Sequence, residues 1–294
     1  MKLIRRLFMF LLFLVFLLAL VVGGIFIYVK SVYDINLFTV GNSLVKLTYE
    51  VDEKKLITNP YTEEDLMSSK TQLNKINAIT EKDNGYSFDY DNLNFEEMDV
   101  KLSDKECAAF FSQFCEESMN STITNGNFNI PFEILQVDFS DCSSEGANFN
   151  VIIKLDIREI KKSLNEFPLN LISGYIPDYL YISSTVEVKD LGELNYTSNS
   201  KELKVNNLES EECMEILGIL NAFLKLGTYE EFNVMIGNIF VDGLIGNSSS
   251  EGFTYRLKKE GNKDLGPLGS LGVKGFSFLT NNNEDYYVIE IGIL

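Results

Sequence analysis

An uncharged apolar run from Leu7 to Val29 constrains this chain more than any other feature of its sequence. The run reads LFMFLLFLVFLLALVVGGIFIYV and contains no proline. As an α-helix it would be about 35 Å long, enough to cross the hydrocarbon core of a bilayer. We therefore predict a cytoplasmic flank and a transmembrane helix within residues 1–30, followed by a polar body from residue 31.

Basic side chains flank this run on its N-terminal side. Lys2, Arg5 and Arg6 precede it, and the first thirty residues contain no acid. The positive-inside rule then places the N-terminus in the cytoplasm and the rest of the chain outside. A cleaved secretory signal is the alternative, but the run is longer than a typical signal core and no clear cleavage site follows it. We expect a single-pass protein of the cytoplasmic membrane with an extracytoplasmic C-terminal domain.

The chain is strongly acidic and lacks histidine. It has 25 Lys and Arg against 43 Asp and Glu, which gives a net charge of −18. A protein that binds nucleic acid needs a basic face, so we exclude nucleic acid as a partner. Without histidine the chain lacks the usual general base and the commonest zinc ligand. We expect no enzymatic activity, no catalytic residue, no metal site and no cofactor.

Two short patterns resemble known site motifs but lack the chemistry around them. Ser198 and Lys201 have the spacing of a serine–lysine acyl-transfer motif, yet they fall in a predicted polar turn rather than at the start of a helix. Asp83, Asp89 and Asp91 suggest a calcium loop, but they do not follow the spacing of an EF-hand. We interpret both as solvated turns.

Three helix patterns stand out in the polar body. The helix predicted over 102–119 begins at a capping box, in which Ser103 and Glu106 each bond the backbone of the other. A second long helix is predicted over 210–227, and apolar residues cover almost its whole circumference, which indicates deep burial. A shorter helix, with a threonine cap and acids in its first turn, is predicted over 62–79.

The remaining patterns predict strands that alternate apolar with polar residues or lie between turn signals. We place strands at 44–51, 86–90, 95–100, 132–140, 149–157, 179–188, 193–197, 203–205, 232–245, 253–257, 276–279 and 286–293, a short helix at 158–166, and turns at 82–85, 143–146, 190–192, 198–200 and 247–252. The fold class predicted is α+β, with a strongly curved antiparallel sheet wrapped on two long helices.

Parts of the chain repeat at an offset of 106 residues, the difference between positions 107 and 213. The matching residues are Leu102, Glu106 and Cys107 with Leu208, Glu212 and Cys213, and the SSEG at 143–146 with the SSEG at 249–252. Identity elsewhere is low, so chance is the alternative. A true repeat would divide the body into 31–100, a first helix-plus-strands unit at 101–200 and a second at 201–294. We expect free buried thiols, with a Cys107–Cys213 bridge as the alternative.

The segment Val100–Glu106, VKLSDKE, ends a predicted strand and runs into a helix, after an N-terminal anchor and before long hairpins. In this order the chain resembles uncharacterised membrane-anchored extracytoplasmic proteins of low-GC Gram-positive bacteria. Some of these are similar to tubular lipid-binding (TULIP-type) domains, in which a bent antiparallel sheet wraps a long helix around an apolar groove. The resemblance covers roughly residues 95–260, and none of its motifs identifies a site residue.

Two functional hypotheses follow. The first is a protein that binds a lipid or another apolar ligand at the outer face of the cytoplasmic membrane. Its groove would be lined by Phe111, Phe114, Leu217 and Leu220. The second is a structural or protein-interaction component of the cell envelope, with a filled core and a surface for a protein partner.

A glycine-rich loop with three leucines leaves two interpretations open. Leu265, Leu268 and Leu271 lie among Gly266, Gly269, Gly272 and Gly275 in an apolar loop. The loop either caps the edge of the sheet, or it gates an apolar groove or dips into the outer leaflet.

Overall fold

The computed structural model describes most of the polar body. The described residues are 31, 37–82, 85–96, 98–114, 122–125, 128–163, 174, 176–215 and 229–294. The apolar run predicted to cross the membrane, 7–29, lies outside them. Among the helices of the described part, none combines the length and the apolar character that a membrane span requires. The described chain is α+β with antiparallel sheets, as predicted.

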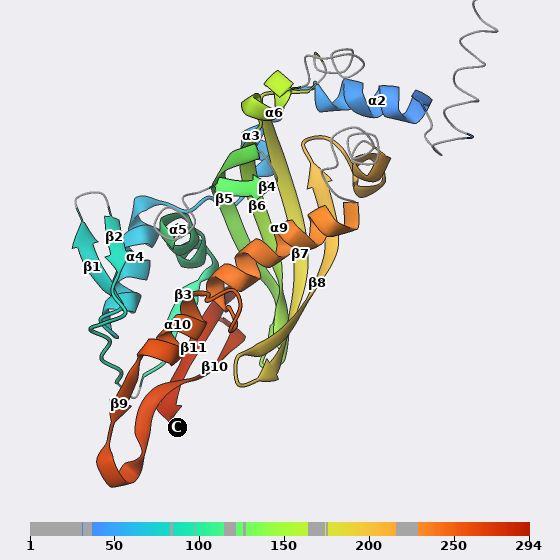
Figure 1. Cartoon of the computed structure of the whole chain (residues 1–294). Coiled ribbons are helices and arrows are strands. Elements are labelled where there is room, and N and C mark those ends of the chain that lie inside the picture. Colours follow the sequence, from blue (N-terminus) through green and yellow to red (C-terminus); the bar gives the residue numbers. More distant parts are fainter. Residues whose placement is uncertain are drawn as a thin grey trace, which may run out of the picture.

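The larger sheet has five antiparallel strands in the order in which they occur in the chain. They are β4 (Thr122–Asn125), β5 (Phe128–Ser143), β6 (Gly146–Asp156), β7 (Tyr179–Gly192) and β8 (Asn195–Val205). Figure 1 shows that these long strands bend together. Register shifts between β5 and β6 and between β7 and β8 mark bulges, which increase twist and bending.

The smaller sheet joins segments from distant parts of the chain. Its order is β3 (Val100–Ser103), β11 (Glu284–Ile293), β10 (Ser270–Asn281) and β9 (Asn262–Asp264), and all neighbours are antiparallel. A separate hairpin pairs β1 (Ile79–Lys82) with β2 (Gly85–Phe88). The predicted turn at 82–85 lies at the end of this hairpin.

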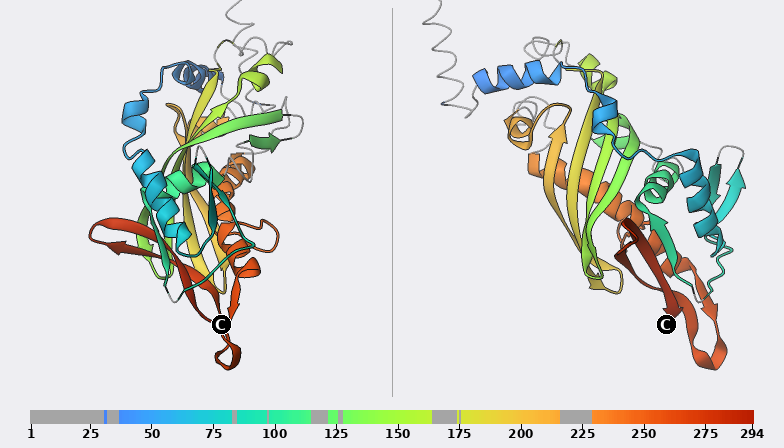
Figure 2. Two further views of the ribbon diagram at one scale, coloured as in Figure 1. Left: turned by 90° about the vertical axis from the view of Figure 1, so that its left-hand side faces the viewer. Right: turned by 180° about the vertical axis from the view of Figure 1, so that it is seen from behind.

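Some of the helices pack on the five-stranded sheet, and others lie beside the smaller sheets or at the ends of the molecule. Those whose bounds lie in the described ranges are α2 (Leu37–Leu47), α3 (Glu53–Leu56), α4 (Glu63–Asn74), α5 (Asp104–Phe114), α6 (Arg158–Ser163), α9 (Tyr229–Leu244) and α10 (Phe253–Glu260), together with the 3-10 turn η2 (Gly266–Leu268). The long helix α9 lies along β7 and β8, and α5 packs on β5. Helix α2 lies at one end of the molecule and the β9–β10 hairpin at the other (Figure 1, Figure 2).

Both predicted helix caps are present. The Asp65 N–H donates to Thr62 Oγ1 at 3.3 Å, and the Thr62 N–H donates to Asp65 Oδ2 at 2.8 Å. At the start of α5, Glu106 N–H donates to Ser103 Oγ at 3.2 Å and Ser103 N–H donates to Glu106 Oε2 at 2.7 Å. Helix α4 ends at Asn74 rather than at residue 79, because residues 79–82 pair as a strand.

The predicted strand at 44–51 is wrong, because its first half belongs to helix α2. Residues 37, 40, 44 and 47 of this helix are apolar and recur at three- and four-residue spacing, which is helical. Leu47 is buried and Ser43, one turn earlier, is fully buried as well. The predicted strand at 95–100 is also wrong except for its last residue, where β3 begins.

The predicted strands at 232–245 and 253–257 are wrong as well, because these residues form α9 and α10. The run FNVMIGNIFV is rich in aromatic and β-branched residues, which favour strands. Its burial is nevertheless helical, since Phe240, Val241 and Leu244 are all at most 1% exposed. The predicted turn at 198–200 is a further error, because β8 continues through it.

The internal repeat is limited to two helix starts. In both, a glutamate accepts from the N–H three residues earlier: Ser103 to Glu106 at 2.7 Å, and Glu209 to Glu212 at 3.2 Å. The SSEG segments differ, because the first joins strands β5 and β6 whereas the second joins helices α9 and α10. The repeat therefore does not carry the same secondary structure along its length.

The cysteines of the described part are free thiols, so no Cys107–Cys213 bridge forms. Cys107 and Cys213 are buried, and each thiol lies near the carbonyl oxygen five residues earlier, at 3.9 Å from Leu102 and 3.8 Å from Leu208. Burial raises the pKa of Cys107 well above its ordinary value. The two thiols are therefore core side chains of similar helix starts.

Candidate functional site

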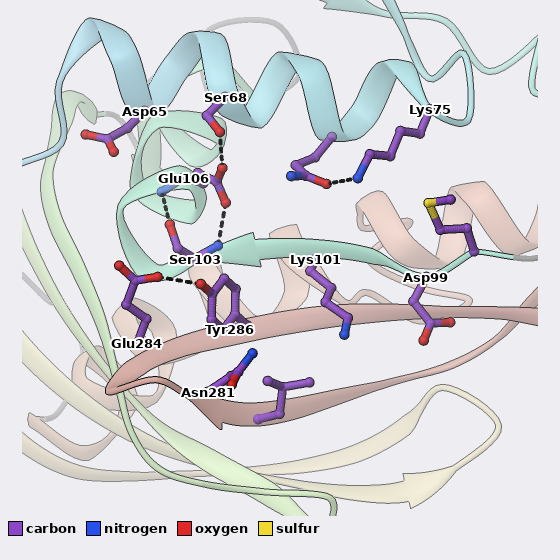
Figure 3. A pocket seen from close by; sticks show the side chains of 13 residues that line it. Asp65, Ser68, Lys75, Asp99, Lys101, Ser103, Glu106, Asn281, Glu284 and Tyr286 are labelled. Carbon is purple, nitrogen blue, oxygen red and sulfur yellow. Dashed lines mark hydrogen bonds between the residues drawn. The ribbon is translucent and has the colours of Figure 1, made fainter.

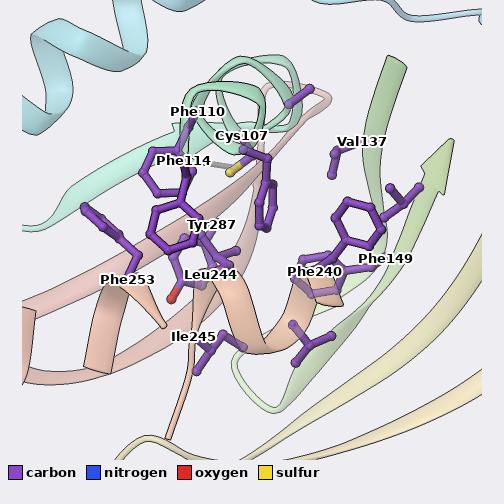
Figure 4. Close-up of a cluster of buried hydrophobic side chains, with 14 of the residues drawn as sticks. Cys107, Phe110, Phe114, Val137, Phe149, Phe240, Leu244, Ile245, Phe253 and Tyr287 are labelled. Carbon is purple, nitrogen blue, oxygen red and sulfur yellow. The ribbon is translucent and has the colours of Figure 1, made fainter. Parts of the chain in front are cut away.

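Phe111 and Phe114, two of the four residues predicted to line an apolar groove, lie in a cluster of aromatic rings. The aromatic cluster consists of Phe88, Tyr90, Phe110, Phe111, Phe114, Phe240 and Phe253. Figure 4 labels Phe110, Phe114, Phe240 and Phe253. Phe111 is 1% exposed and Phe114 is 4% exposed. The other two residues of the predicted groove, Leu217 and Leu220, lie outside the described residues, so a groove shared by all four stays a prediction.

The rings of the cluster contact one another in edge-to-face, tilted and stacked pairs. The ring centroids of Phe110 and Phe253 lie 4.6 Å apart, and those of Phe111 and Phe240 lie 5.6 Å apart. Such pairs contribute about 0.5–1.5 kcal/mol each beyond the burial of their area. A Cβ atom added at Gly243 of α9 would lie 3.5 Å from Phe111 Cε1. Side chains of α5, α9 and α10 therefore fill the space beside Phe111 and Phe114.

On the inner face of β7, the buried side chains are apolar with one exception. Along β7, alternate residues from Ile182 to Val188 are buried, and the buried position between Ile182 and Val186 is Ser184. The cross-strand neighbours of Ser184 are Val151 and Leu203. Among the described residues, the Ser184 hydroxyl has no hydrogen-bond partner, and the residue is 1% exposed. Because buried polar groups are nearly always hydrogen-bonded, this hydroxyl is unusual.

Helix α9 is joined to the edge strand β8 by a polar seam. The seam consists of three pairs that follow one face of the strand: Tyr196 with Asp242, Ser198 with Asn238, and Ser200 with Asn233. Ser198 Oγ lies 2.6 Å from Asn238 Oδ1. Burial raises the pKa of the Tyr196 phenol well above its ordinary value, and the Asp242 carboxylate raises it further. The contact of α9 with β8 is thus polar, in contrast to its contact with α5.

The structure separates Ser198 from Lys201. Ser198 faces α9, whereas the Lys201 ammonium lies 3.4 Å from Glu187 Oε1 and 3.2 Å from Asn148 Oδ1, on the outer face of the sheet. The two side chains cannot act as a nucleophile and its base, since they lie on opposite faces of β8.

The acidic run that suggested a calcium loop forms a turn. The Asp89 carboxylate accepts from the backbone N–H of Asp91 at 3.1 Å and of Asn92 at 3.2 Å. Asp83 lies outside the described residues. Within the described ranges, no group of three or more acidic or cysteine side chains is placed to hold a metal ion.

A polar cavity of about 550 Å³ lies between α4, β3 and the turn that joins β10 to β11 (Figure 3). Its side chains include Asp65, Ser68 and Lys75 of α4, Lys101 of β3, Glu106 of α5 and Glu284 of β11. Glu106 is 8% exposed, and its carboxylate accepts from the Ser68 hydroxyl and the Ser103 N–H. The sequence did not indicate this cavity, because its walls come from three distant segments.

No protein-family model matches the chain, and no curated protein matches it in sequence. Among solved structures, the chain is similar to a crystal structure of a lipopolysaccharide binding protein, with a TM-score of 0.24 and 9% sequence identity. The match covers 67% of this chain and 41% of that protein, so the chain spans less than half of its length. At this TM-score the likeness assigns neither a fold family nor a ligand.

Proposed function

We propose that the chain is a membrane-anchored extracytoplasmic protein without enzymatic activity, which binds a lipid-like or other apolar ligand. The ligand lies between α9 and the inner face of the five-stranded sheet, close to the outer face of the cytoplasmic membrane. The observation that carries this proposal is the polar seam between α9 and β8, which covers an otherwise apolar face.

Because the seam is polar, separation of α9 from β8 costs little free energy. When a polar contact separates, water replaces the lost partner, so each hydrogen bond contributes only about 0.5–1.5 kcal/mol. Separation of α9 from α5 would expose the rings of the aromatic cluster to water, and no new interaction would offset that free-energy cost. Helix α9 therefore stays attached to α5 and separates from β8, and an acyl chain enters at the edge of the sheet.

Ser184 supplies the polar contact that such a ligand needs. Its hydroxyl lies on the inner face of β7 and has no hydrogen-bond partner in the described part of the chain. The ester or carboxyl oxygen of a lipid accepts a hydrogen bond from a serine hydroxyl. One donor among apolar neighbours is also the usual composition of a site for an apolar ligand, where few polar groups fix the orientation.

The proposed membrane anchor holds the binding site close to the membrane, which is the source of the lipid ligand. The run Leu7–Val29 ends eight residues before α2 begins at Leu37, so α2 marks the end of the domain nearest the membrane. The net charge of −18 keeps the body away from anionic headgroups. A tethered body then meets lipids without adhering to the membrane surface.

Native mass spectrometry of the full chain, released from detergent in the spectrometer, tests this proposal. We expect a bound species whose added mass equals one membrane lipid. Ser184→Leu fills the inner face and should remove that species, whereas Ser183→Leu, on the opposite face of β7, should keep it. Thermal melting shows whether each variant folds. A folded wild-type chain that retains no lipid, or a folded Ser184→Leu that retains as much as Ser183→Leu, contradicts the proposal.

A structural or interaction role in the cell envelope is the second candidate, and the filled aromatic cluster favours it. The β9–β10 hairpin offers a contact surface, because Leu268 at its tip is 73% exposed and Ile293 beside it is 48% exposed. Leu271 is buried and Leu265 packs against the core, so two of the three loop leucines cover the sheet. Leu268→Asp should then abolish co-purification of an envelope protein and leave lipid retention unchanged.

A further inference from the structure

The polar cavity has an acidic end and a lysine end. Figure 3 shows Asp65 and Glu284 at one end of it, and Lys75 and Lys101 towards the other. The two ends follow the direction of α4, with Asp65 in its first turn and Lys75 at its C-cap. Ten residues of helix separate these two positions, which corresponds to about 15 Å.

The acids of the cavity are already held by donors of the protein. Asp65 Oδ2 accepts from the Thr62 N–H at 2.8 Å, and Glu284 Oε2 accepts from the Tyr286 hydroxyl. Asp99, which lies next to the lysine end, accepts from the Ile291 N–H at 3.1 Å. One oxygen of each of these carboxylates is engaged, and the other accepts no hydrogen bond from a described residue.

Lys101 differs from the acids in having no partner in the described part of the chain. Among the described residues, Lys75 is bonded only to the side-chain oxygen of Gln72, at 2.5 Å, so no carboxylate neutralises its charge there. Nine of the eighteen described lysines form ion pairs with carboxylates. A lysine that projects into a cavity without such a pair is therefore free to bind an acceptor group of a ligand.

The geometry points to a binding site for a short extended peptide with two free ends. Its ammonium group lies between Asp65 and Glu284, and its carboxylate lies at Lys101 and Lys75. An extended peptide of about four residues spans the distance between the two ends. A simple anion fits poorly, because the four carboxylates that line the cavity outnumber its two lysines. The cavity volume of about 550 Å³ is within the range of ligand sites.

Calorimetric titration of the full chain in detergent with tetra-alanine tests this inference. We expect binding of the peptide with free ends, at least tenfold weaker binding of its N-acetylated form and at least tenfold weaker binding of its C-terminal amide. Lys101→Ala and Glu284→Gln should each weaken binding at least tenfold. Lys274→Ala is the matched control, since Lys274 is an exposed lysine of β10 outside the cavity.

Three results would overturn the inference. The first is no binding of tetra-alanine at millimolar concentration by a chain that melts cooperatively. The second is equal binding of the amide and the free acid, because the lysine end would then have no role. The third is an equal effect of Lys274→Ala and Lys101→Ala. Retention of lipid by the same preparation is measured separately, so either site can fail without the other.

Discussion

Helix α9 has two sides that are attached to the molecule in different ways. Towards α5 it contributes Phe240 and Leu244, both at most 1% exposed, to a cluster of rings in direct contact. Towards β8 it contributes Asn233, Asn238 and Asp242 to the polar seam. One side of α9 is therefore fixed by apolar burial. The other side is held by hydrogen bonds whose loss costs little free energy, because water replaces the lost partner.

The largest effect is expected from Phe111→Ala, on the side of the aromatic cluster. Removal of a buried phenylalanine leaves a cavity and costs about 3–5 kcal/mol of unfolding free energy. Urea denaturation of the full chain in detergent measures it. Leu268→Ala is the control, since this residue is 73% exposed and its loss should change stability by less than about 0.5 kcal/mol. A cost near 1 kcal/mol for Phe111→Ala would indicate an open groove instead of packed rings.

A pair of glycine substitutions in α9 distinguishes its two sides by sign. A Cβ at Gly237 would lie 2.6 Å from Val186 Cγ2, whereas a Cβ at Gly243 would first meet Phe111 at 3.5 Å, an ordinary contact. Gly243→Ala should therefore stabilise the helix by about 0.5–1 kcal/mol. Gly237→Ala should cost about 1–3 kcal/mol, because α9 must move away from β7. Denaturation curves of the two variants with the same sign of change would refute this packing.

The sequence predicts the parts of this fold that depend on local chemistry. The caps at Thr62 and Ser103 were identified because a cap needs only a hydroxyl and an acid three residues later. The strands β5, β6, β10 and β11 were identified because a half-buried strand alternates within its own length. In each case a window of a few residues contains the whole signal.

The sequence wrongly predicts a strand for α9, because the features that favour a helix there are contacts with other elements of the fold. Its aromatic and β-branched residues favour a strand, and only the close approach at Gly237 and the rings around Phe240 make the helix the better solution. The polar cavity was missed for a related reason. Asp65, Lys101 and Glu284 line the same cavity because β3 pairs with the last strand of the chain. No spacing in the sequence indicates that pairing.

Substitutions in the polar seam should change the unfolding free energy less than substitutions in the aromatic cluster or at the glycines of α9. Ser198→Ala removes one seam hydrogen bond and should cost about 0.5–1.5 kcal/mol of unfolding free energy. Lys201→Ala, three residues along the same strand but on the outer face, should cost no more than about 0.5 kcal/mol, since exposed ion pairs contribute little. Denaturation of both variants measures the difference. A larger loss from Lys201→Ala would place the stabilising contacts of β8 on its outer face.

The smallest effect is expected from two glutamates near α2, which respond to acid in opposite directions. A hydrogen bond from the Lys46 ammonium lowers the pKa of Glu212 below its ordinary value. Its contribution to stability is therefore present above the ordinary pKa and is lost as the pH falls through that value and below it. Burial raises the pKa of Glu215, and the Glu212 and Glu211 carboxylates raise it further. The folded state then binds a proton more readily at Glu215 than the unfolded state does, so this group favours folding at low pH and opposes it as the pH rises through the raised pKa.

Thermal melting between about pH 7 and about pH 3 separates the two contributions, because the ordinary pKa of a glutamate lies in that interval. Glu212→Gln should make the melting temperature fall less on acidification than it does in the wild type. Glu215→Gln should make it fall more, since the compensating gain is removed. Glu133→Gln, an exposed glutamate of β5, is the control and should follow the wild type. If both variants change the fall in melting temperature in the same direction, the Lys46–Glu212 ion pair and the burial of Glu215 do not have opposite effects on stability at low pH. The attachment of α2 would then depend on apolar contacts such as Leu47, as the attachment of α9 to α5 does.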